Sequence, residues 1–356
     1  MNDVHPPPGG LVRRASRVLL LGQHGFEPLL ASELPEAGLA AQEMGGGWVL
    51  AVSKGDDVAT RSLGDLCFPH FALLLSEEIR GDSVNALAHE LAQFSFESFH
   101  GEEFEGAWPC VFLGAPEQPG LGRRVAAAEK AFHQLLKKRL ARIARLATPV
   151  LSAGRGYARG LVVYFADFGR VFVAREVWCA GQRRMADDPL APSRSYLKIE
   201  EAYLVMGREP GEGDSVCDLG ASPGGWSYSA AKRGARVVAV DNGPLKGGAL
   251  DHALIEHRRE DAFRYTPPSG SVFEWMFCDL VEDPRRVVAN LVHSWLRHGW
   301  CRRFVIVLKF GRTDALRLLH EVRAADSPFS LYSRHLRIHH LFHNREEFTV
   351  VGEVVS

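Results

Sequence analysis

The glycine-rich segment at 218–226 constrains the fold more than any other part of the chain. An apolar VCDL runs directly into GASPGGW, and a helical SYSAAKRG follows. A glycine turn between a strand and a helix is where open parallel sheets bind ligands. Its G-A-S-P-G-G spacing matches neither GxGxxG nor GK[ST], and Pro223 lacks a backbone donor that a pyrophosphate would need. The turn therefore predicts a ligand without phosphates that approaches the backbone closely.

The C-terminal half, over residues 190–356, alternates apolar strands with helical segments. Such alternation is typical of βαβ units, and runs such as FVIVL, apolar on both faces, fit a sheet that is covered on both sides. We therefore predict an α/β domain with a mostly parallel, Rossmann-like sheet. The expected strands lie at 216–221, 236–241, 274–280 and 303–310, with a final pair in 335–343 and 347–355.

The length of 356 residues suggests two domains or three. The first 16 residues are rich in Pro, Gly and Arg and are expected to be disordered. A small α+β unit is expected over 17–105. A second unit, over 106–185, contains a basic helix and a β-hairpin whose turn is predicted at 167–170. The polar, unpatterned stretch that follows this hairpin is expected to contain the main domain boundary.

Charge is balanced overall but distributed unevenly. The chain has 42 Lys+Arg against 43 Asp+Glu, yet 76–118 holds nine acidic residues and one basic, whereas 123–145 holds eight basic residues and one acidic. The basic stretch predicts an amphipathic helix, and two interpretations remain open: a nucleic-acid contact or a solvated face. Its expected apolar stripe comprises Ala126, Phe132, Leu135, Leu136, Leu140 and Ile143.

Other features of the composition indicate the expected location and the absence of membrane and metal partners. No apolar run approaches the length of a membrane span, so no membrane partner is expected. The six cysteines form no CxxC pair, which favours a reducing, cytoplasmic location. His339 and His343 are four residues apart, but their segment is predicted to be extended rather than helical, so no metal is expected.

Three carboxylates follow successive strands around the glycine turn. Asp218 precedes the turn, Asp241 ends the second strand, where it could accept both ribose hydroxyls, and Asp261 could accept from an adenine amino group. Each alone is more often a helix cap or turn residue. Together with the turn they predict S-adenosylmethionine as the cofactor.

Four further ionisable residues are expected to converge at the same sheet edge. Lys198 lies in a helix before the first strand, Asp279 and Lys309 end the fourth and fifth strands, and Glu347 opens the last. The carboxyl ends of parallel strands meet above the cofactor loop. Taken alone, Lys309 could equally be a lysine that extends from a strand end into water. As a group, the four predict a site for acid–base chemistry.

These four residues around DLGASPGGW resemble the K-D-K-E tetrad of RNA ribose 2′-O-methyltransferases. The order and spacing of further segments resemble the RlmM family of bacterial 23S rRNA methyltransferases: 191–202, 218–228, 240–245, 275–284, 294–302 and 344–350. The resemblance implies a ferredoxin-like unit over 17–105, a THUMP-like RNA-binding domain over 106–185, and 2′-O-methylation of a cytidine in large-subunit rRNA. Transfer RNA or another structured RNA as target, or a non-catalytic cofactor-binding assembly factor, stay open.

The resemblance also implies roles for individual residues. Lys309 would accept the proton of the ribose 2′-hydroxyl. A lysine acts as a base only when its pKa is lowered, and we expect the neighbouring Lys198 to lower it by repulsion while Asp279 and Glu347 orient both ammonium groups. Asp279 would also lie at the reactive end of the cofactor site, which would be lined by Ser195, Ser222, Pro223, Gly224, Gly225, Asp241 and Asp261.

Overall fold

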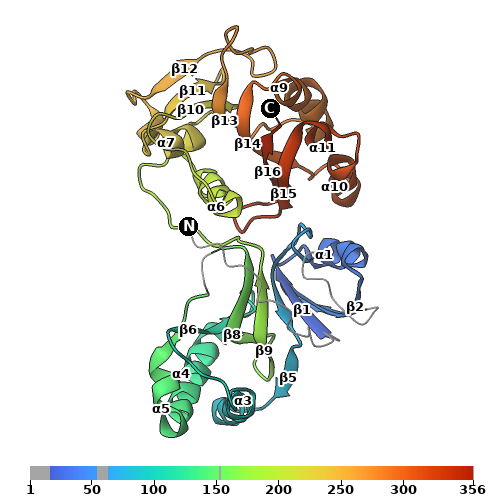
Figure 1. Ribbon diagram of the computed structural model, residues 1–356, viewed down its shortest axis with the longest axis vertical. Helices are drawn as coiled ribbons and strands as arrows, with labels where there is room; N and C mark the ends of the chain where they lie inside the picture. Colours follow the sequence, from blue (N-terminus) through green and yellow to red (C-terminus); the bar gives the residue numbers. More distant parts are fainter. Residues whose placement is uncertain (1–16, 54–62, 152–153, 356) are drawn as a thin grey trace. The chain divides into compact units, whose positions relative to one another are not determined.

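The computed structural model of the chain describes residues 17–53, 63–151 and 154–355. The predicted disordered segment 1–16 lies outside these ranges. The described chain forms two compact units (Figure 1). The C-terminal unit consists of 179–355 together with the short stretches 67–70 and 154–156, and the N-terminal unit contains the rest.

A seven-stranded sheet forms the centre of the C-terminal unit, in the order β12-β11-β10-β13-β14-β16-β15. Neighbouring strands from β12 to β14 pair in parallel, whereas β16 is antiparallel to both β14 and β15. The predicted α/β class and the six predicted strands are confirmed. The strands are β10 Ser215–Leu219, β11 Arg236–Val240, β12 Ile255–Arg258, β13 Phe273–Cys278, β14 Cys301–Lys309, β15 Ser333–His339 and β16 Glu347–Val354.

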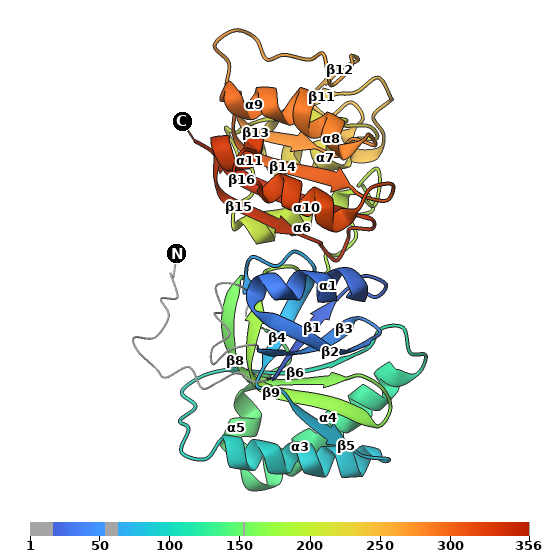
Figure 2. The ribbon, with the colours of Figure 1, turned by 90° about the vertical axis from the view of Figure 1, so that its right-hand side faces the viewer.

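Helices cover both faces of this sheet, which explains why its central strands are apolar throughout. Figures 1 and 2 show α6 and α7 on one face and α9, α10 and α11 on the other. Tyr203 of α6 and Trp226 of α7 pack with Trp275, Phe277 and Val305 of the strands in one buried cluster. The helices are α6 Tyr196–Met206, α7 Gly225–Ala231, α8 Pro284–Val287, α9 His293–Arg297, α10 Ala315–Arg323 and α11 Pro328–Tyr332.

The C-terminal unit also contains a segment from early in the chain, Cys67–His70, which we call the inserted segment. The Cys67 carbonyl accepts from the His340 backbone N–H at 2.8 Å. The His70 ring Nε2 lies 2.8 Å from the His340 carbonyl oxygen. The Phe68 ring meets that of Phe310 edge-on at 6.3 Å between centroids. The inserted segment thus packs against the residue that follows Lys309.

The N-terminal unit is built on one mixed sheet, in the order β2-β3-β1-β4-β9-β8-β6-β7, with β5 also paired to β9. Strands from both predicted N-terminal ranges, 17–105 and 106–185, belong to this sheet, and the division between those ranges stays a prediction. The elements are β1 Arg17–Gly22, α1 Glu27–Glu33, β2 Leu39–Gly45, β3 Trp48–Ser53, β4 Pro69–Leu74, β5 Glu77–Arg80, α3 Val84–Ser98, β6 Trp108–Gly114, α4 Leu121–Arg139, α5 Ala141–Leu146, β7 Ala147–Thr148, β8 Gly156–Phe165 and β9 Arg170–Cys179.

The predicted hairpin is confirmed as β8 and β9, which are neighbours in this sheet. Its turn is held by Asp167, whose Oδ1 accepts from the backbone N–H groups of Gly169 and Arg170, each at 2.7 Å. A carboxylate that bonds to the backbone two and three residues ahead is a common turn device.

The basic stretch forms two helices rather than one. Leu140 leaves the helical conformation (φ −131°, ψ 57°), so α4 ends and α5 begins there. The expected stripe was partly wrong because Ala126 is exposed, and the fully buried positions of α4 are Leu121, Val125, Ala128, Phe132 and Leu136.

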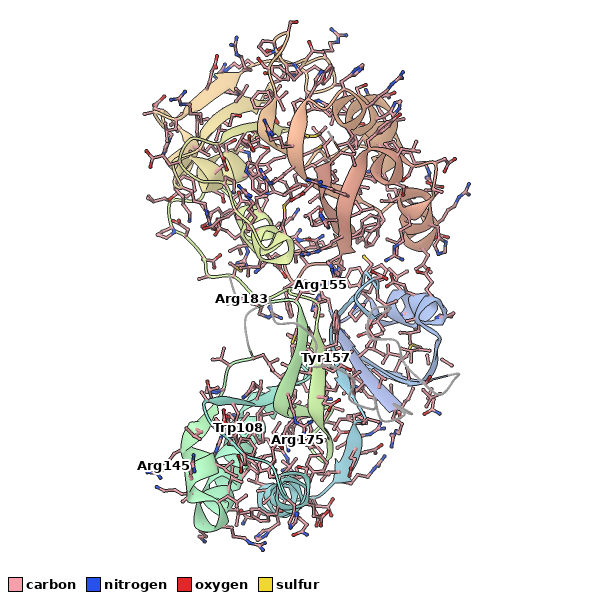
Figure 3. The ribbon with its side chains drawn as sticks, in the orientation of Figure 1. Trp108, Arg145, Arg155, Tyr157, Arg175 and Arg183 are labelled. Atoms are coloured by element: carbon pink, nitrogen blue, oxygen red, sulfur yellow. The ribbon has the colours of Figure 1, made fainter. Side chains whose placement is uncertain are left out.

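The second helix is fixed by a side chain of β6. Trp108 donates through Nε1 to the Ile143 carbonyl at 2.8 Å, so Ile143 contacts the sheet while the exposed Arg145 extends outward (Figure 3). No described helix is long and apolar enough to cross a membrane.

Candidate active site

The turn between β10 and α7 requires glycine at two positions. Gly220 has φ +83° and Gly224 has φ +104°, which is the left-handed region that other residues rarely adopt. A Cβ on Gly220 would lie 2.5 Å from Leu280 Cδ2, and one on Gly224 would lie 2.5 Å from Ala249 Cβ. The backbone of the turn therefore lies closer to its neighbours than a side chain would allow.

Asp241 ties this turn to the loop after β11. Its Oδ2 accepts from the Ser222 backbone N–H at 3.1 Å, and its Oδ1 accepts from the Gly243 N–H at 2.7 Å. Ser222 Oγ donates to the Pro244 carbonyl at 3.0 Å. Pro223 follows Ser222 through a cis peptide bond. Each Asp241 oxygen keeps accepting capacity beyond its one backbone bond, as a ribose diol would need.

Two of the predicted cofactor residues meet at the start of α6 and α7. A Cβ on Gly225 would lie 3.4 Å from Ser195 Oγ and 3.2 Å from Ser193 Oγ. The buried Trp226 donates through Nε1 to the Ser195 carbonyl at 2.9 Å. Ser195 and Gly225 are therefore within contact range of one another, and their contact with a cofactor stays a prediction.

Asp261 differs from the other predicted cofactor residues because its contacts are local. It is exposed in the loop after β12, and its Oδ1 accepts from the Phe263 N–H at 2.9 Å. Its Oδ2 lies 3.8 Å from Arg264 Nε. The structure places Asp261 beyond β12 without a direct bond to the glycine turn, so its contact with an adenine stays a prediction.

Asp218 lies beneath the turn and is almost fully buried. Ser227 Oγ donates to its Oδ2 at 2.6 Å. Burial raises the pKa of Asp218 to about 7, and Ser227 opposes that rise. This carboxylate therefore anchors the start of α7 to β10.

The four residues of the predicted tetrad form a closed ring in which cations and carboxylates alternate. Lys198 Nζ lies 3.2 Å from Asp279 Oδ2 and 2.6 Å from Glu347 Oε1. Lys309 Nζ lies 3.0 Å from Glu347 Oε2 and donates to Asp279 Oδ1. Each ammonium group thus contacts both carboxylates. The exposed fractions of the side chains are 12% for Lys198, 14% for Asp279, 23% for Lys309 and 7% for Glu347.

Strand register explains why residues so distant in the sequence meet. In the antiparallel pair β14 and β16, Lys309 and Glu347 are direct Cα partners. Asp279 follows the last residue of β13, which pairs in parallel with β14. Lys198 lies on the first turn of α6. The last residue of one strand and the first of its antiparallel neighbour necessarily share an edge of the sheet.

The charges of the ring set the protonation of its members. Burial alone would raise the pKa of Asp279, but the charges of Lys198 and Lys309 outweigh it and the pKa is lowered. Burial alone would lower the pKa of Lys309, but Asp279 and Glu347 outweigh it and the pKa is raised. The expectation of a lowered pKa for Lys309 is therefore wrong for this arrangement, because two carboxylates contact that lysine.

Glu201 is a buried carboxylate that the sequence argument missed. It is fully buried, and its two oxygens accept from the backbone N–H groups of Phe342 at 3.0 Å and His343 at 3.2 Å. Burial raises the pKa of Glu201 to about 8. Its position three residues after Lys198, on the same helix, was the available signal. Glu201 fixes the loop that leads to Glu347.

The histidines near this loop do not gather around a common point. His339 is the last residue of β15, and His343 Nε2 accepts from the Met185 backbone N–H at 2.8 Å. Across the described residues, no group of three or more His, Cys, Asp or Glu side chains is placed to hold a metal ion.

The donor chemistry of the turn fits S-adenosylmethionine. Gly220 and Gly224 bring the backbone close to a ligand, and residues 220–225 contain no lysine or arginine that would favour a phosphate. Asp241 offers its carboxylate for a ribose diol. Asp279, with its lowered pKa, would offer a negative charge to the cationic sulfur of a bound cofactor.

The chain is similar to several known methyltransferases. Residues 191–283 match the FtsJ-like methyltransferase family. Ribosomal RNA large subunit methyltransferase M of Xanthomonas oryzae pv. oryzae (strain MAFF 311018) is 31% identical over 95% of this chain and 99% of its own length. The protein of the same name from Laribacter hongkongensis (strain HLHK9) is 36% identical over 64% of this chain and 66% of its own. The crystal structure of TrmN from Thermus thermophilus matches loosely, with 16% identity and a TM-score of 0.36 over 95% of this chain and all of that one. The chain belongs to the ribosomal RNA large subunit methyltransferase M family.

Proposed function

We propose that this methyltransferase transfers the methyl group of S-adenosylmethionine to the 2′-oxygen of a ribose in 23S rRNA. The observation that carries the proposal is the ring of Lys198, Asp279, Lys309 and Glu347 at the edge of the sheet that holds the glycine turn. The names of the relatives support a large-subunit rRNA target. A cytidine as the modified nucleotide rests on the family resemblance of the sequence.

Lys309 is the proton acceptor in this mechanism. A ribose hydroxyl is a poor nucleophile at neutral pH, so its proton must leave as the new bond to carbon forms. When bound, the cofactor supplies an electrophilic methyl group on a positively charged sulfur. The two carboxylates hold Lys309 in its charged form in the structure described. A further cation beside Asp279 would weaken that hold and bring the pKa of Lys309 down, so Lys309 would become a base only in the loaded site.

The other members of the ring position and stabilise. Lys198 shares both carboxylates with Lys309 and keeps a fixed positive charge beside the oxygen that becomes negative. Glu347 is the least exposed member and contacts both ammonium groups. It therefore orients them before the substrate arrives, and most of the acceleration comes from this positioning.

The N-terminal unit captures the RNA in this proposal. The exposed basic side chains of α4 and α5 face solvent, and Arg145 marks the end of that surface (Figure 3). The ferredoxin-like and THUMP-like assignments, over 17–105 and 106–185, remain part of the proposal. So does a cytoplasmic location, which the six buried, free cysteines support.

Labelled S-adenosylmethionine and unmodified RNA test the function directly. Wild-type protein is incubated with 23S rRNA transcript, 16S rRNA transcript and transfer RNA, and alkali-resistant dinucleotides are mapped. Label at a cytidine of the 23S transcript is the expected result. Label confined to transfer RNA would remove the ribosomal assignment, and no label would favour a protein that binds the cofactor without catalysis.

Two substitutions at Lys309 test the base. Lys309→Ala removes the acceptor, and Lys309→Arg keeps a cation between the carboxylates but cannot release its proton. Both variants should bind S-adenosylmethionine with near-normal affinity and lose about 10²–10⁴-fold in methyl transfer. Near-normal turnover by Lys309→Arg would show that the residue contributes charge and not proton transfer.

A further inference from the structure

Three arginines lie on the chain segments that bring the tetrad together. Arg194 precedes Lys198 by four residues, Arg312 follows Lys309 by three, and Arg345 precedes Glu347 by two. All three are exposed. We call Arg194, Arg312 and Arg345 the edge arginines.

Backbone contacts bring two of these segments side by side. The Phe310 N–H donates to the Glu346 carbonyl at 2.8 Å. A Cβ on Gly311 would lie 2.6 Å from Glu346 Oε2. The loop that carries Arg312 therefore lies against the loop that carries Arg345.

The third segment approaches the same loop from α6. Glu201 of α6 accepts from the Phe342 and His343 backbone N–H groups. Burial and then the positive charges of Arg184 and Arg194 lower the pKa of His343, so Arg194 lies within electrostatic reach of that ring. The three segments that carry the edge arginines therefore lie next to one another, and each also carries a tetrad residue.

Two acidic side chains on neighbouring loops already have partners, whereas the edge arginines have no ion pair. Asp314 Oδ1 accepts from the Arg317 N–H at 3.0 Å at the start of α10, and Glu282 pairs with Arg286 at 2.9 Å. Among the residues that the structure describes, no edge arginine has a side-chain ion pair. Two exposed carboxylates lie near these segments: Glu346, beside Gly311, and Asp187, whose charge acts on the same His343 ring as that of Arg194. The edge arginines outnumber these two carboxylates, and none of the three is held in an ion pair among the described residues, so they remain available to an anionic ligand.

A ribose inside a polynucleotide arrives with a phosphodiester on each side. Guanidinium groups bind phosphate oxygens through two parallel hydrogen bonds, and phosphate contacts set the register of a nucleic acid on a protein. We propose that the edge arginines hold the phosphates that flank the ribose in the tetrad. This inference rests on the proposed function and adds the positioning of its RNA substrate.

The opposite edge of the same sheet offers a matched control. Arg236 is exposed and is the first residue of β11, whereas the tetrad lies where β13 and β14 end. β11, β10, β13 and β14 run parallel, so Arg236 lies at the amino-terminal ends of the strands, whereas the tetrad lies at their carboxyl ends. Replacing Arg236 removes one exposed arginine from the unit and leaves the edge arginines in place.

The test compares Arg194→Ala/Arg312→Ala/Arg345→Ala with Arg236→Ala and wild type. Methyl transfer to unmodified 23S rRNA transcript gives kcat and KM, and filter binding at several salt concentrations gives the salt slope. The triple variant should raise the KM for RNA about tenfold or more and reduce the slope of log affinity against log salt by about two. Affinity for S-adenosylmethionine and the thermal midpoint should not change, and Arg236→Ala should match wild type. The corresponding triple Lys variant should recover part of the affinity, because it keeps charge but loses the bidentate contact.

An unchanged KM and salt slope in the triple variant would overturn the inference. A loss of cofactor affinity equal to the loss of RNA affinity would also overturn it, because that result indicates a distorted site. Filter binding requires no catalysis, so the proposed role of the edge arginines in RNA binding is tested even if wild-type protein leaves the transcript unmethylated. That last outcome would count against the proposed function alone.

Discussion

His339 gives the C-terminal unit a pH dependence that one substitution should remove. The residue is 1% exposed, and neither ring nitrogen has a hydrogen-bond partner among the described residues. Burial, followed by the charges of Arg155 and Arg337, lowers the pKa of His339 to about 3. The folded protein therefore keeps this ring neutral throughout the mildly acidic range.

The direction and size of the effect follow from proton linkage. In the unfolded chain the ring takes up its proton near pH 6.5, whereas in the folded chain it does so near pH 3. Between these values the unfolded state binds more protons, so stability is complete above pH 6.5 and is lost as the pH falls. At pH 5.0 the difference from pH 6.5 is 1.5 units, which costs about 2 kcal/mol at about 1.36 kcal/mol per unit.

The assay is urea unfolding of wild type and His339→Phe at pH 7.5 and pH 5.0. His70 and His340 are also buried, with pKa values lowered by burial to about 3 and about 4, but both proteins retain them and their effects cancel. Wild type should lose about 2 kcal/mol more than His339→Phe between the two pH values. At pH 7.5 the variant should be at least as stable, because two unpartnered buried nitrogens are gone.

An exposed histidine of the same unit provides the control. His298→Gln should lose as much stability on acidification as wild type. Equal losses in wild type and His339→Phe would refute the reasoning, because they would mean that the buried ring takes up its proton without unfolding.

Two further predictions concern RNA capture and the cofactor turn. Three exposed basic residues at the end of α4, Lys137, Lys138 and Arg139, can be replaced together by Glu. This variant should bind 23S rRNA transcript more weakly and with a smaller salt dependence, while its affinity for the cofactor is unchanged. An unaltered RNA affinity would show that these side chains contact solvent only. Gly220→Ala should weaken S-adenosylmethionine binding, measured by calorimetry, and lower stability by about 1–3 kcal/mol, because the new methyl group meets Leu280 and the left-handed φ is strained. Gly211→Ala, with open space at its Cβ, is the control, and equal cofactor affinity in both variants would contradict the tight-turn argument.

Much of the site could be predicted because its residues lie at strand ends. Asp279 and Lys309 end apolar runs, and the carboxyl ends of parallel strands share one edge. Glu347 opens the last strand, so an antiparallel partner brings it to that same edge. The sequence therefore placed Asp279 and Lys309 together, whereas the position of Glu347 beside them depends on the antiparallel direction of β16, which the structure shows.

The direction of the Lys309 pKa could not be predicted in the same way. Sequence pattern indicated that Lys198 would be a neighbour, but not that each lysine would contact both carboxylates. The balance between repulsion and attraction depends on distances of a few ångströms. The break at Leu140 was equally hidden, because the apolar spacing continues through it.

The inserted segment was beyond sequence reasoning for a different reason. Nothing near Phe68 or His70 indicates that their contacts lie with Phe310 and His340, far along the chain. Periodicity describes which face of an element is buried, but it does not identify the element that buries it.

This interleaving means that the catalytic unit is not a separable module. A fragment that starts at residue 179 contains all four tetrad residues yet lacks the ring that packs on Phe310, directly after Lys309. During synthesis, Phe68 leaves the ribosome long before β14 and the 340–343 loop. These two segments complete their packing only when they contact the inserted segment. A domain exchange between relatives would therefore have to move residues 67–70 together with the C-terminal half.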